Sequence, residues 1–511
     1  MKMQILIIDV KCQINKSKLQ FEEGVGPYKL ATLAKRQGAE VRVFQDHLYD
    51  ADPEKIAKII RTFENKRTIL AFSLLTNGLP TMLEIIRLTA DLKLPVMIGG
   101  AGATIDPKTV IAQAAELLPI ATPLILTEGD GENAFAQLLK IKPKNWQNYA
   151  EIWRRNDYGI IKEGHFQLCK IDDSPEADLS ASQQRRLFLH LSAETNEPWQ
   201  DRYNYLRSLT NSQVECGRGC YYRCGYCNTS CLRHQEVRKK PAGQVAREII
   251  NLHRRYGITF FSLTDNVALD RPYYWREFAK RLAEFPEMPQ LFFGGYSAPH
   301  FLSSKEWHSE LLPLLCEVGL RSIIVGVQSG SRRILKEIIH RPINDPEEAL
   351  ELVKRGVELG INIKTDFIIG HPTETTADLQ DTYEQMKKIV TAGGETFVRK
   401  LNVIPHSRYD QRLKSGEWSL PPDSPERLLL ENKIFALKRD DSHYRLLVLA
   451  GNRPMPNKYL IDRRLKIIYP HKIFSVEQLK EARQKLIAAN MIESAKRRYL
   501  MMFDLLIDNR P

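Results

Sequence analysis

Short apolar runs alternate with amphipathic segments along the first 145 residues. The runs are four to five residues long, and most of the segments between them begin at a proline. This alternation is typical of parallel strands joined by helices. The pattern therefore predicts a doubly wound parallel sheet with strands at Gln4–Ile8, Glu40–Phe44, Ile69–Ser73, Pro95–Ile98 and Pro123–Leu126, and helices at Pro27–Gln37, Pro53–Phe63, Leu79–Leu92 and Pro107–Leu117.

A second alternating region extends from residue 211 to about residue 405. A strand and a helix repeat there about six times, which predicts a partial (β/α)6 barrel with its chemistry at the carboxyl ends of the strands. After a first strand, the predicted strands are Thr259–Thr264, Gln290–Gly294, Ser322–Val327, Asn362–Ile369 and Thr396–Asn402. The predicted helices are Gln244–Tyr256, Pro272–Glu284, Lys305–Val318, Arg332–Ile338, Pro346–Leu359 and Thr376–Ala392.

The two remaining segments have weaker patterns. Residues 146–210 are polar and lack clear periodicity, which predicts a linker that packs locally through Trp146, Trp153 and Trp199. Residues 406–511 predict a mainly helical cap with helices at Pro425–Arg439, Val476–Ala489 and Ser494–Phe503. The α/β chain is thus predicted to have domains at 1–145 and 211–405, a linker and a C-terminal cap.

The amino-acid composition excludes few classes of function. Lys and Arg total 74 against 62 Asp and Glu, for a formal charge of +12, which would attract an acidic partner without identifying one. No basic stripe is interleaved with aromatic residues, so we do not expect nucleic acid to bind. The apolar run near Met1 is too short for a signal sequence, and no stretch is long enough to span a membrane. We expect a cytoplasmic protein without a membrane partner.

Four of the eight cysteines lie within twelve residues, from Cys216 to Cys227. Cys220, Cys224 and Cys227 have the spacing C-x3-C-x2-C, which lets one loop present three thiolates to an iron-sulfur cluster and leaves the fourth iron without a protein ligand. A zinc site would need a fourth ligand, for which Cys216 or Cys231 is available. Disulfides would need an oxidising compartment.

With an aromatic residue, Tyr226, before its last cysteine, this loop resembles the cluster loop of the radical S-adenosylmethionine (SAM) enzymes. The resemblance implies that the open iron of a 4Fe-4S cluster binds the amino and carboxyl groups of SAM. An electron from a donor such as flavodoxin or ferredoxin would then split SAM into methionine and a 5'-deoxyadenosyl radical.

Polar groups and glycines at three later strand ends match SAM-binding positions of the same family. The resemblance implies SAM contacts from the end of the second strand, the end of the fourth strand and the turn after the fifth, in addition to the cluster loop. The residues predicted to bind SAM are Tyr226, Thr264, Asp265, Asn266, Gln328, Ser329, Gly370 and Glu374.

The strand ends of the first region resemble a Rossmann-like cobalamin-binding domain that precedes the radical SAM domain in one subclass. The residues that carry this resemblance are Ser73, Leu75, Gly99, Gly100, Thr104 and Glu128. The Asp-x-His-x-x-Gly signature of that domain is missing, because no histidine follows Asp9 within five residues and His47 lies in the wrong loop. A bare scaffold is the alternative, and a dinucleotide site is disfavoured because no G-x-G-x-x-G follows the first strand.

We therefore expect cobalamin-dependent methyl transfer to an unactivated carbon of a small molecule or peptide. Peptide epimerisation, ring contraction or another rearrangement is the main alternative, and epimerisation would use Cys231 or Cys316 as hydrogen donor. Methylthiolation would require a second cluster on three N-terminal cysteines, whereas only Cys12 and Cys169 precede Cys216. A non-catalytic cobalamin or metal carrier would cleave no SAM.

Overall fold

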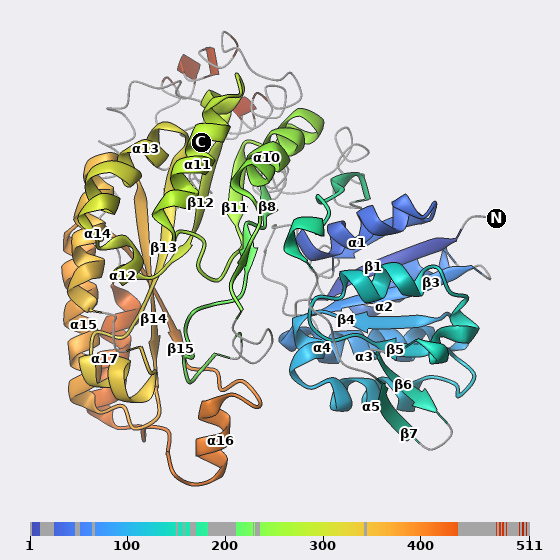
Figure 1. Cartoon of the computed structure of the whole chain (residues 1–511). Helices are drawn as coiled ribbons and strands as arrows, with labels where there is room; N and C mark the ends of the chain where they lie inside the picture. Colours follow the sequence, from blue (N-terminus) through green and yellow to red (C-terminus); the bar gives the residue numbers. More distant parts are fainter. Residues whose placement is uncertain are drawn as a thin grey trace. The chain divides into compact units, whose positions relative to one another are not determined.

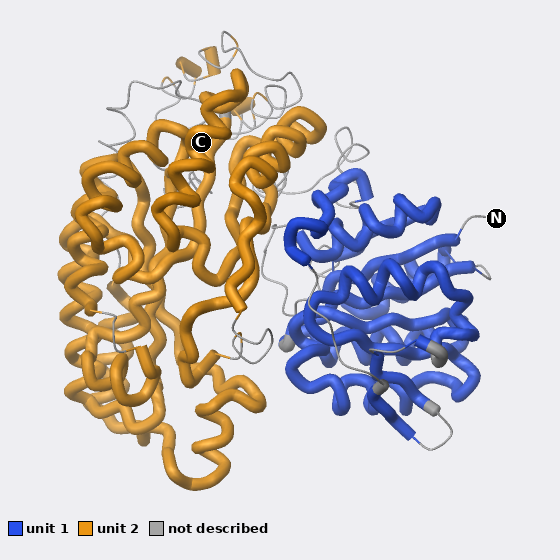
Figure 2. The backbone as a smooth tube through the Cα atoms, viewed as in Figure 1, with its two compact units in different colours: residues 1–196 blue, residues 197–511 orange. Residues whose placement is uncertain are grey.

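The computed structural model describes two compact units, residues 1–196 and 197–511 (Figure 2). The residues described are 3–10, 25–45, 52–63, 67–149, 152–156, 159–163, 170–181, 211–227, 229, 236–341 and 345–437, with isolated residues between 477 and 507. Among them, no helix is both long and apolar enough to cross a bilayer.

The first unit contains a seven-stranded sheet in the order β2-β1-β3-β4-β5-β6-β7 (Figure 1). The first five strands of the chain pair in parallel, as predicted. The order of these five strands reverses direction at β1 and β3, so a ligand would bind beyond their carboxyl ends. The strands are β1 (Gln4–Val10), β2 (Glu40–Gln45), β3 (Thr68–Leu74), β4 (Val96–Gly99), β5 (Leu124–Leu126), β6 (Ile152–Asn156) and β7 (Gly159–Glu163).

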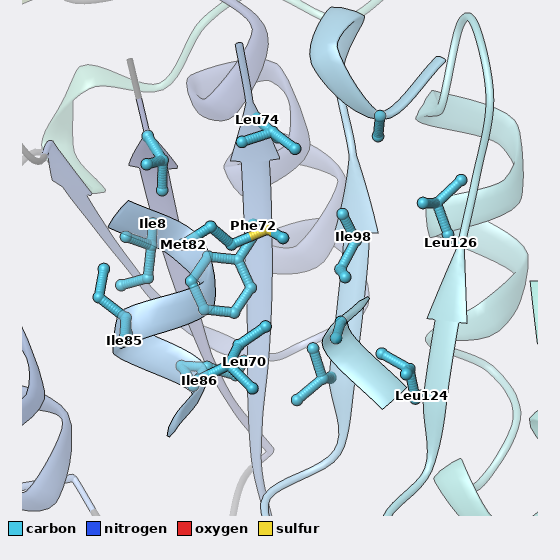
Figure 3. Packing of buried hydrophobic residues seen from close by; sticks show 14 of the residues in the cluster. Ile8, Leu70, Phe72, Leu74, Met82, Ile85, Ile86, Ile98, Leu124 and Leu126 are labelled. Atoms are coloured by element: carbon cyan, nitrogen blue, oxygen red, sulfur yellow. The ribbon is translucent and has the colours of Figure 1, made fainter. Parts of the chain in front are cut away.

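Alternate residues of these strands build the core on one face of the sheet. Ile8, Phe72 and Ile98 pack with Met82 and Ile85 (Figure 3), and each fully buried side chain of this kind contributes about 1.5–3 kcal/mol. The helices of the unit are α1 (Val25–Arg36), α2 (Pro53–Arg61), α3 (Leu79–Thr89), α4 (Ala101–Ile105), α5 (Pro107–Leu117) and α6 (Glu132–Leu138).

The segment expected to be a linker contributes an antiparallel hairpin to the sheet. Strand β6 pairs with β5 and with β7, and Trp146 is buried. Residues 170–181 contact α1, where Lys29 Nζ donates to Ser174 Oγ at 2.9 Å. The hairpin escaped prediction because the two adjacent arginines of β6 hide its two-residue period. Trp199 lies outside the described residues.

The second unit contains a six-stranded parallel sheet in the order β15-β14-β13-β12-β11-β8, which is the order of the strands along the chain (Figure 1). This arrangement confirms the predicted partial barrel. The strands are β8 (Asn211–Val214), β11 (Phe260–Leu263), β12 (Phe292–Ser297), β13 (Leu320–Gln328), β14 (Asn362–Ile369) and β15 (Glu395–Lys400), and a short pair is formed by β9 (Gly217–Arg218) and β10 (Arg238–Lys239).

The helices follow the predicted ranges with two local departures. Predicted helix Lys305–Val318 contains the π-helix η8 (Trp307–Leu311), and Arg332–Ile338 contains the π-helix η9 (Ile334–Ile338). Such bulges arise from i→i+5 bonds that no hydrophobic period predicts. The helices are α10 (Ala242–Tyr256), α11 (Pro272–Ala283), α12 (Pro299–Leu302), α13 (Leu312–Glu317), α14 (Pro346–Leu359), α15 (Thr376–Thr391), α16 (Arg408–Lys414) and α17 (Pro425–Ala436).

Part of the predicted C-terminal cap is described. Helix α17 packs against α15 and ends three residues earlier than predicted, because Leu437 is already extended. The other two predicted helices, within 476–503, fall almost entirely outside the described residues.

One face of the second sheet keeps partly exposed side chains. Tyr296 of β12 and Phe397 of β15 are each 40% exposed. Asp366 of β14 is in register with Phe397 and so lies on the same face. In β12 and β14 the residues that alternate with Tyr296 and Asp366 are buried, whereas those that alternate with Phe397 in β15 are partly or largely exposed. The partly exposed face is thus the one able to hold a ligand.

Candidate active site

The start of the cysteine loop is fixed by a buried carboxylate. Asp265, directly after β11, accepts a hydrogen bond from the Cys216 backbone N–H at 2.8 Å and forms an ion pair with Lys239 Nζ at 3.0 Å. Asp270 lies 3.3 Å from the same ammonium, and all three side chains are almost fully buried. We call Asp265, Lys239 and Asp270 the loop latch. The Asp265 carboxylate thus has partners within the protein, and its contact with SAM stays a prediction.

The end of the cysteine loop is fixed through Gly225. Its N–H donates to the Ile339 carbonyl at 3.1 Å, and its carbonyl accepts from the Tyr409 N–H at 3.0 Å. A Cβ at this position would lie 2.5 Å from the Tyr409 ring, so only glycine allows α16 to close on the loop.

The cysteines of this loop interact electrostatically. Burial is the largest cause that raises the pKa of Cys220 and of Cys224 to about 11, the neighbouring thiolates act in the same direction, and the Arg341 charge opposes them. The thiols are therefore protonated when no metal is bound, and metal binding must displace protons. None of the five cysteines in the described part of the chain forms a disulfide.

This donor set fits a cluster. No three His, Cys, Asp or Glu side chains converge on a single metal-ion position among the described residues. A 4Fe-4S cluster does not require such convergence, because each thiolate ligates a different iron. Cys220, Cys224 and Cys227, presented by one loop with two rigid anchors, would hold three irons.

Cys216 differs from these three cysteines. It is fully buried, and burial raises the pKa of its thiol well above the ordinary value. Its carbonyl accepts from the Lys240 N–H at 2.7 Å. These contacts give Cys216 a packing role beside the loop latch.

Tyr226 packs within an aromatic cluster with His371 and Tyr409. The ring centroids of Tyr226 lie 6.2 Å from each of the other two rings. His371 Nδ1 and the Tyr409 hydroxyl are 3.0 Å apart, and burial lowers the pKa of His371 to about 3, so this histidine is neutral. The cluster supports the cysteine loop from the α16 side. Contact between Tyr226 and SAM stays a prediction.

The turn after β13 contains two residues predicted to bind SAM, Gln328 and Ser329, and they differ in their surroundings. Ser329 is fully buried, and its Oγ lies 3.1 Å from Thr382 Oγ1 of α15. A Cβ at Gly330 would lie 2.4 Å from the Asp381 carbonyl. Ser329 therefore joins β13 to α15, and its contact with SAM stays a prediction. Gln328, in the left-handed region at φ 74°, remains a candidate.

Glu374 also has a structural partner. Its Oε2 accepts from Arg427 Nη2 of α17 at 2.6 Å and from the Gly370 N–H at 2.8 Å, and both charged side chains are buried. This ion pair holds α17, while Glu374 Oε1 has no hydrogen-bond partner among the described residues. The SAM contact of Glu374 stays a prediction. Gly370 has open space where a Cβ would project and a φ of 86°, so it remains a candidate.

Thr264 and Asn266 flank the loop latch. The Thr264 N–H donates to the Val214 carbonyl at 3.0 Å, and Asn266 Nδ2 lies 3.5 Å from the Gly219 carbonyl. Asn266 is exposed. Both residues thus lie at the carboxyl ends of β8 and β11 beside the cysteine loop, and their SAM contacts stay predictions.

Cys316 is wrongly placed for a hydrogen donor. It lies near the end of α13, three residues before Gly319 and the amino end of β13, and its Sγ is 3.3 Å from the Leu359 carbonyl, which precedes β14. The cysteine loop instead follows the carboxyl end of β8, so Cys316 is at the opposite end of the sheet. Cys231, the other predicted donor, lies outside the described residues.

In the first unit, the predicted cobalamin residues lie at the strand ends, as expected, but several have contacts within the protein. Thr104 Oγ1 donates to the Gly100 carbonyl at 2.9 Å and accepts from the Gly129 N–H at 2.8 Å. Glu128 accepts a hydrogen bond from Trp153 and pairs with Lys162 at 3.1 Å. These two side chains join neighbouring loops and the β6-β7 hairpin.

The glycines at these strand ends are required by the fold itself. A Cβ at Gly100, whose φ is 98°, would lie 2.7 Å from the Leu74 carbonyl, and one at Gly99 would lie 3.0 Å from Thr127 Oγ1. Ser73 is half-buried. Leu75, at 42%, is the exposed side chain among the six predicted residues. An exposed leucine at the end of β3 is suited to an apolar ligand surface.

Residues 214–386 match the family model described as the radical SAM superfamily. The match begins at the end of β8 and includes the cysteine loop, α10 and the four strands β11 to β14 with the helices between them. The chain carries a radical SAM domain. The family prediction made from the cysteine spacing is thereby confirmed.

Two curated relatives extend beyond the radical SAM domain. The chain is 24% identical over 402 residues to the cytidylyl-2-hydroxyethylphosphonate methyltransferase of Streptomyces wedmorensis, covering 70% of this chain and 71% of the relative. It is 22% identical to an uncharacterized methyltransferase of Pyrococcus horikoshii, covering 71% and 73%. Shorter matches include tRNA methylthiotransferases, such as one from Protochlamydia amoebophila at 28% identity over 45% of its length.

Two solved structures share the two-unit fold. One is the radical SAM methyltransferase TsrM from Kitasatospora setae with cobalamin and a 4Fe-4S cluster bound, with a TM-score of 0.62, 17% identity, and coverage of 81% of this chain and 75% of that one. The other is the cobalamin-dependent SAM radical enzyme OxsB, with a TM-score of 0.61, 14% identity, and coverage of 99% and 79%. The fold class predicted from the sequence is confirmed.

Sequence reasoning missed two buried cations of the radical SAM domain. Lys239 lies in the loop latch, and Arg341 stands over the Tyr222 ring with its guanidinium carbon 4.0 Å from the ring centroid. Neither residue belongs to a motif, and each contacts residues that are distant in the sequence. A search for basic residues at the ends of strands and helices could have found them.

Proposed function

We propose that this protein is a cobalamin-dependent radical SAM methyltransferase that methylates an unactivated carbon of a small molecule. The observation that carries the proposal is the presence, in one chain, of a three-cysteine loop on a six-stranded parallel sheet and a parallel sheet with a reversal of strand order at β1 and β3. When bound, the cluster and SAM supply the radical that activates the carbon, and cobalamin supplies the methyl group.

The residues of the chain then hold and orient these groups. Cys220, Cys224 and Cys227 give up three protons and hold the cluster. The loop latch and Gly225 fix both ends of the loop, so that the thiolates keep their positions without reorganisation. Gln328, Gly370 and Asn266 remain as polar or open positions at neighbouring strand ends, where SAM would bind.

Cobalamin would lie on the strand ends of the first unit. Leu75 offers an exposed apolar surface there, and the flanking Ser73, Gly99 and Gly100 are small. The sequence after β1 has no histidine that could ligate cobalt from below. We therefore propose that cobalamin is held by shape and apolar contact rather than by a histidine ligand.

The similarity to named methyltransferases over about 70% of the chain favours methyl transfer over rearrangement. Methylthiolation is disfavoured because only Cys12 and Cys169 precede the cluster loop. A reducing cytoplasmic location and a flavodoxin-like or ferredoxin-like electron donor complete the proposal.

The test is the formation of S-adenosylhomocysteine by the full-length chain, reconstituted anaerobically with iron and sulfide and reduced in the presence of SAM. We expect S-adenosylhomocysteine only when hydroxocobalamin has been supplied, because SAM then donates a methyl group to cobalamin. Leu75→Asp should lower cobalamin retention, measured by absorbance, without changing the iron content. Equal amounts of S-adenosylhomocysteine with and without cobalamin would refute cobalamin-dependent methyl transfer and favour the rearrangement alternative.

A further inference from the structure

Arg341 is a buried cation for which the described residues supply no ion pair. The residue is 5% exposed. Its Nη1 donates to the Gly326 carbonyl at 2.9 Å, and its guanidinium lies over the Tyr222 ring of the cysteine loop. Its Nε has no hydrogen-bond partner in the part of the chain that the structure describes. A carbonyl and a ring compensate only part of the cost of burying a full charge, so the site is suited to an additional negative group.

The backbone at the end of η9 sets the position of the Arg341 side chain. The π-helix η9 is closed by the bond from the Ile339 N–H to the Ile334 carbonyl at 2.9 Å, and the Arg341 N–H then turns back to the Leu335 carbonyl at 2.7 Å. Between them, His340 adopts a left-handed conformation with a φ of 61°, which is costly for a residue other than glycine. A strained helix end that directs one arginine inward is typical of a functional position.

The guanidinium contacts the cysteine loop through Tyr222, because its carbon lies 4.0 Å from the centroid of the Tyr222 ring. Tyr222 packs against the buried group that contains Cys224 and Ile338. It stands between Cys220 and Cys224 in the sequence. The guanidinium thus faces the loop that would hold a cluster, and its field acts through a poorly solvated region where screening is weak.

We propose that Arg341 raises the reduction potential of the cluster held by Cys220, Cys224 and Cys227. One-electron reduction adds a negative charge to the cluster, and a fixed positive charge beside it stabilises the reduced form; net charge and burial are among the factors that set such potentials. The inference rests on the proposed function, because it requires the cluster, but it assigns Arg341 a role as a positioned charge that no motif of the chain indicates.

The test is a redox titration of the reconstituted full-length protein with dithionite, followed by the electron paramagnetic resonance signal of the reduced cluster, with SAM and cobalamin omitted. Arg341→Gln should lower the ratio of reduced to oxidised cluster at a fixed potential at least tenfold, which is about 59 mV for a one-electron couple. Arg341→Lys should recover most of that ratio because it keeps the charge.

Arg332→Gln is the matched control. Arg332 lies just before the same π-helix, its side chain is 71% exposed, and it pairs with Asp345 at 3.0 Å. Its substitution removes the same charge from a solvated position, so the potential should not change. Any residual shift in this variant measures the effect of net charge alone.

An unchanged potential in Arg341→Gln with full iron content would overturn the inference. If Arg341→Gln and Arg341→Met both lose iron while Arg341→Lys keeps it, the potential of Arg341→Lys decides. A potential near that of the unmodified protein supports the inference, and a potential lowered as far as expected for Arg341→Gln overturns it. Loss of iron from all three variants would mean that the shape of the side chain matters, and would also overturn the inference. Failure of the unmodified protein to bind iron would contradict the proposed function instead.

Discussion

A Cys224→Ala variant is expected to lose the cluster and, with it, all reductive cleavage of SAM. Cys224 is the buried member of the three-cysteine loop, and each of the three thiolates holds a different iron, so the remaining two cannot retain the cluster. The iron content after anaerobic reconstitution should fall from about four per chain to below one. Formation of 5'-deoxyadenosine should fall below detection.

Cys216→Ala is the control for this experiment. Cys216 is also buried and begins the same loop, but its thiol lies against the loop latch and its backbone makes the anchoring hydrogen bonds. An alanine keeps that backbone, so the iron content should stay near that of the unmodified protein. If Cys216→Ala lost as much iron as Cys224→Ala, the assignment of three ligands would be wrong and Cys216 would have to be counted as a fourth.

An Asp265→Ala variant is expected to lower the free energy of unfolding of the second unit by about 3 kcal/mol. The substitution leaves the buried Lys239 ammonium with Asp270 alone and removes the acceptor of the Cys216 N–H. Urea unfolding of the full-length protein measures the change. The iron content should fall in parallel, since the start of the cysteine loop is no longer held.

Glu351→Ala is the matched control for the latch. Glu351 pairs with Lys354 at 2.7 Å, but both side chains are more than half exposed, so water replaces the lost partner at almost no cost. The unfolding midpoint should remain that of the unmodified protein. A midpoint for Asp265→Ala equal to that of Glu351→Ala would show that the loop latch does not stabilise the unit.

The elements of the fold were predictable wherever a pattern is local. Helices α5 and α14 begin at Pro107 and Pro346, each after an aspartate cap, and both have the predicted bounds. The buried strands were found because each is a short apolar run with turn residues on both sides. Strand β6 was missed because its two adjacent arginines hide the two-residue period of a strand. Both π-helices were missed because the one inserted residue does not change the hydrophobic pattern of a helix.

The cysteine ligands were predictable because their spacing is itself the geometry of the loop. The SAM contacts were harder to predict than the cysteine ligands. Ser329 meets Thr382 and Glu374 meets Arg427, in each case 53 residues along the chain, and no local pattern reports such a partner. Polar residues at strand ends are equally suited to ligand binding and to fastening the next helix, and only the three-dimensional contacts distinguish the two roles.

The central claim is that a single loop of this chain holds a cluster with one iron open to SAM. The most direct measurement is the amount of 5'-deoxyadenosine formed when the anaerobically reconstituted protein is reduced with dithionite in the presence of SAM. We predict 5'-deoxyadenosine in at least a stoichiometric amount relative to cluster. A protein that binds its full complement of iron yet forms no 5'-deoxyadenosine under these conditions would contradict the claim.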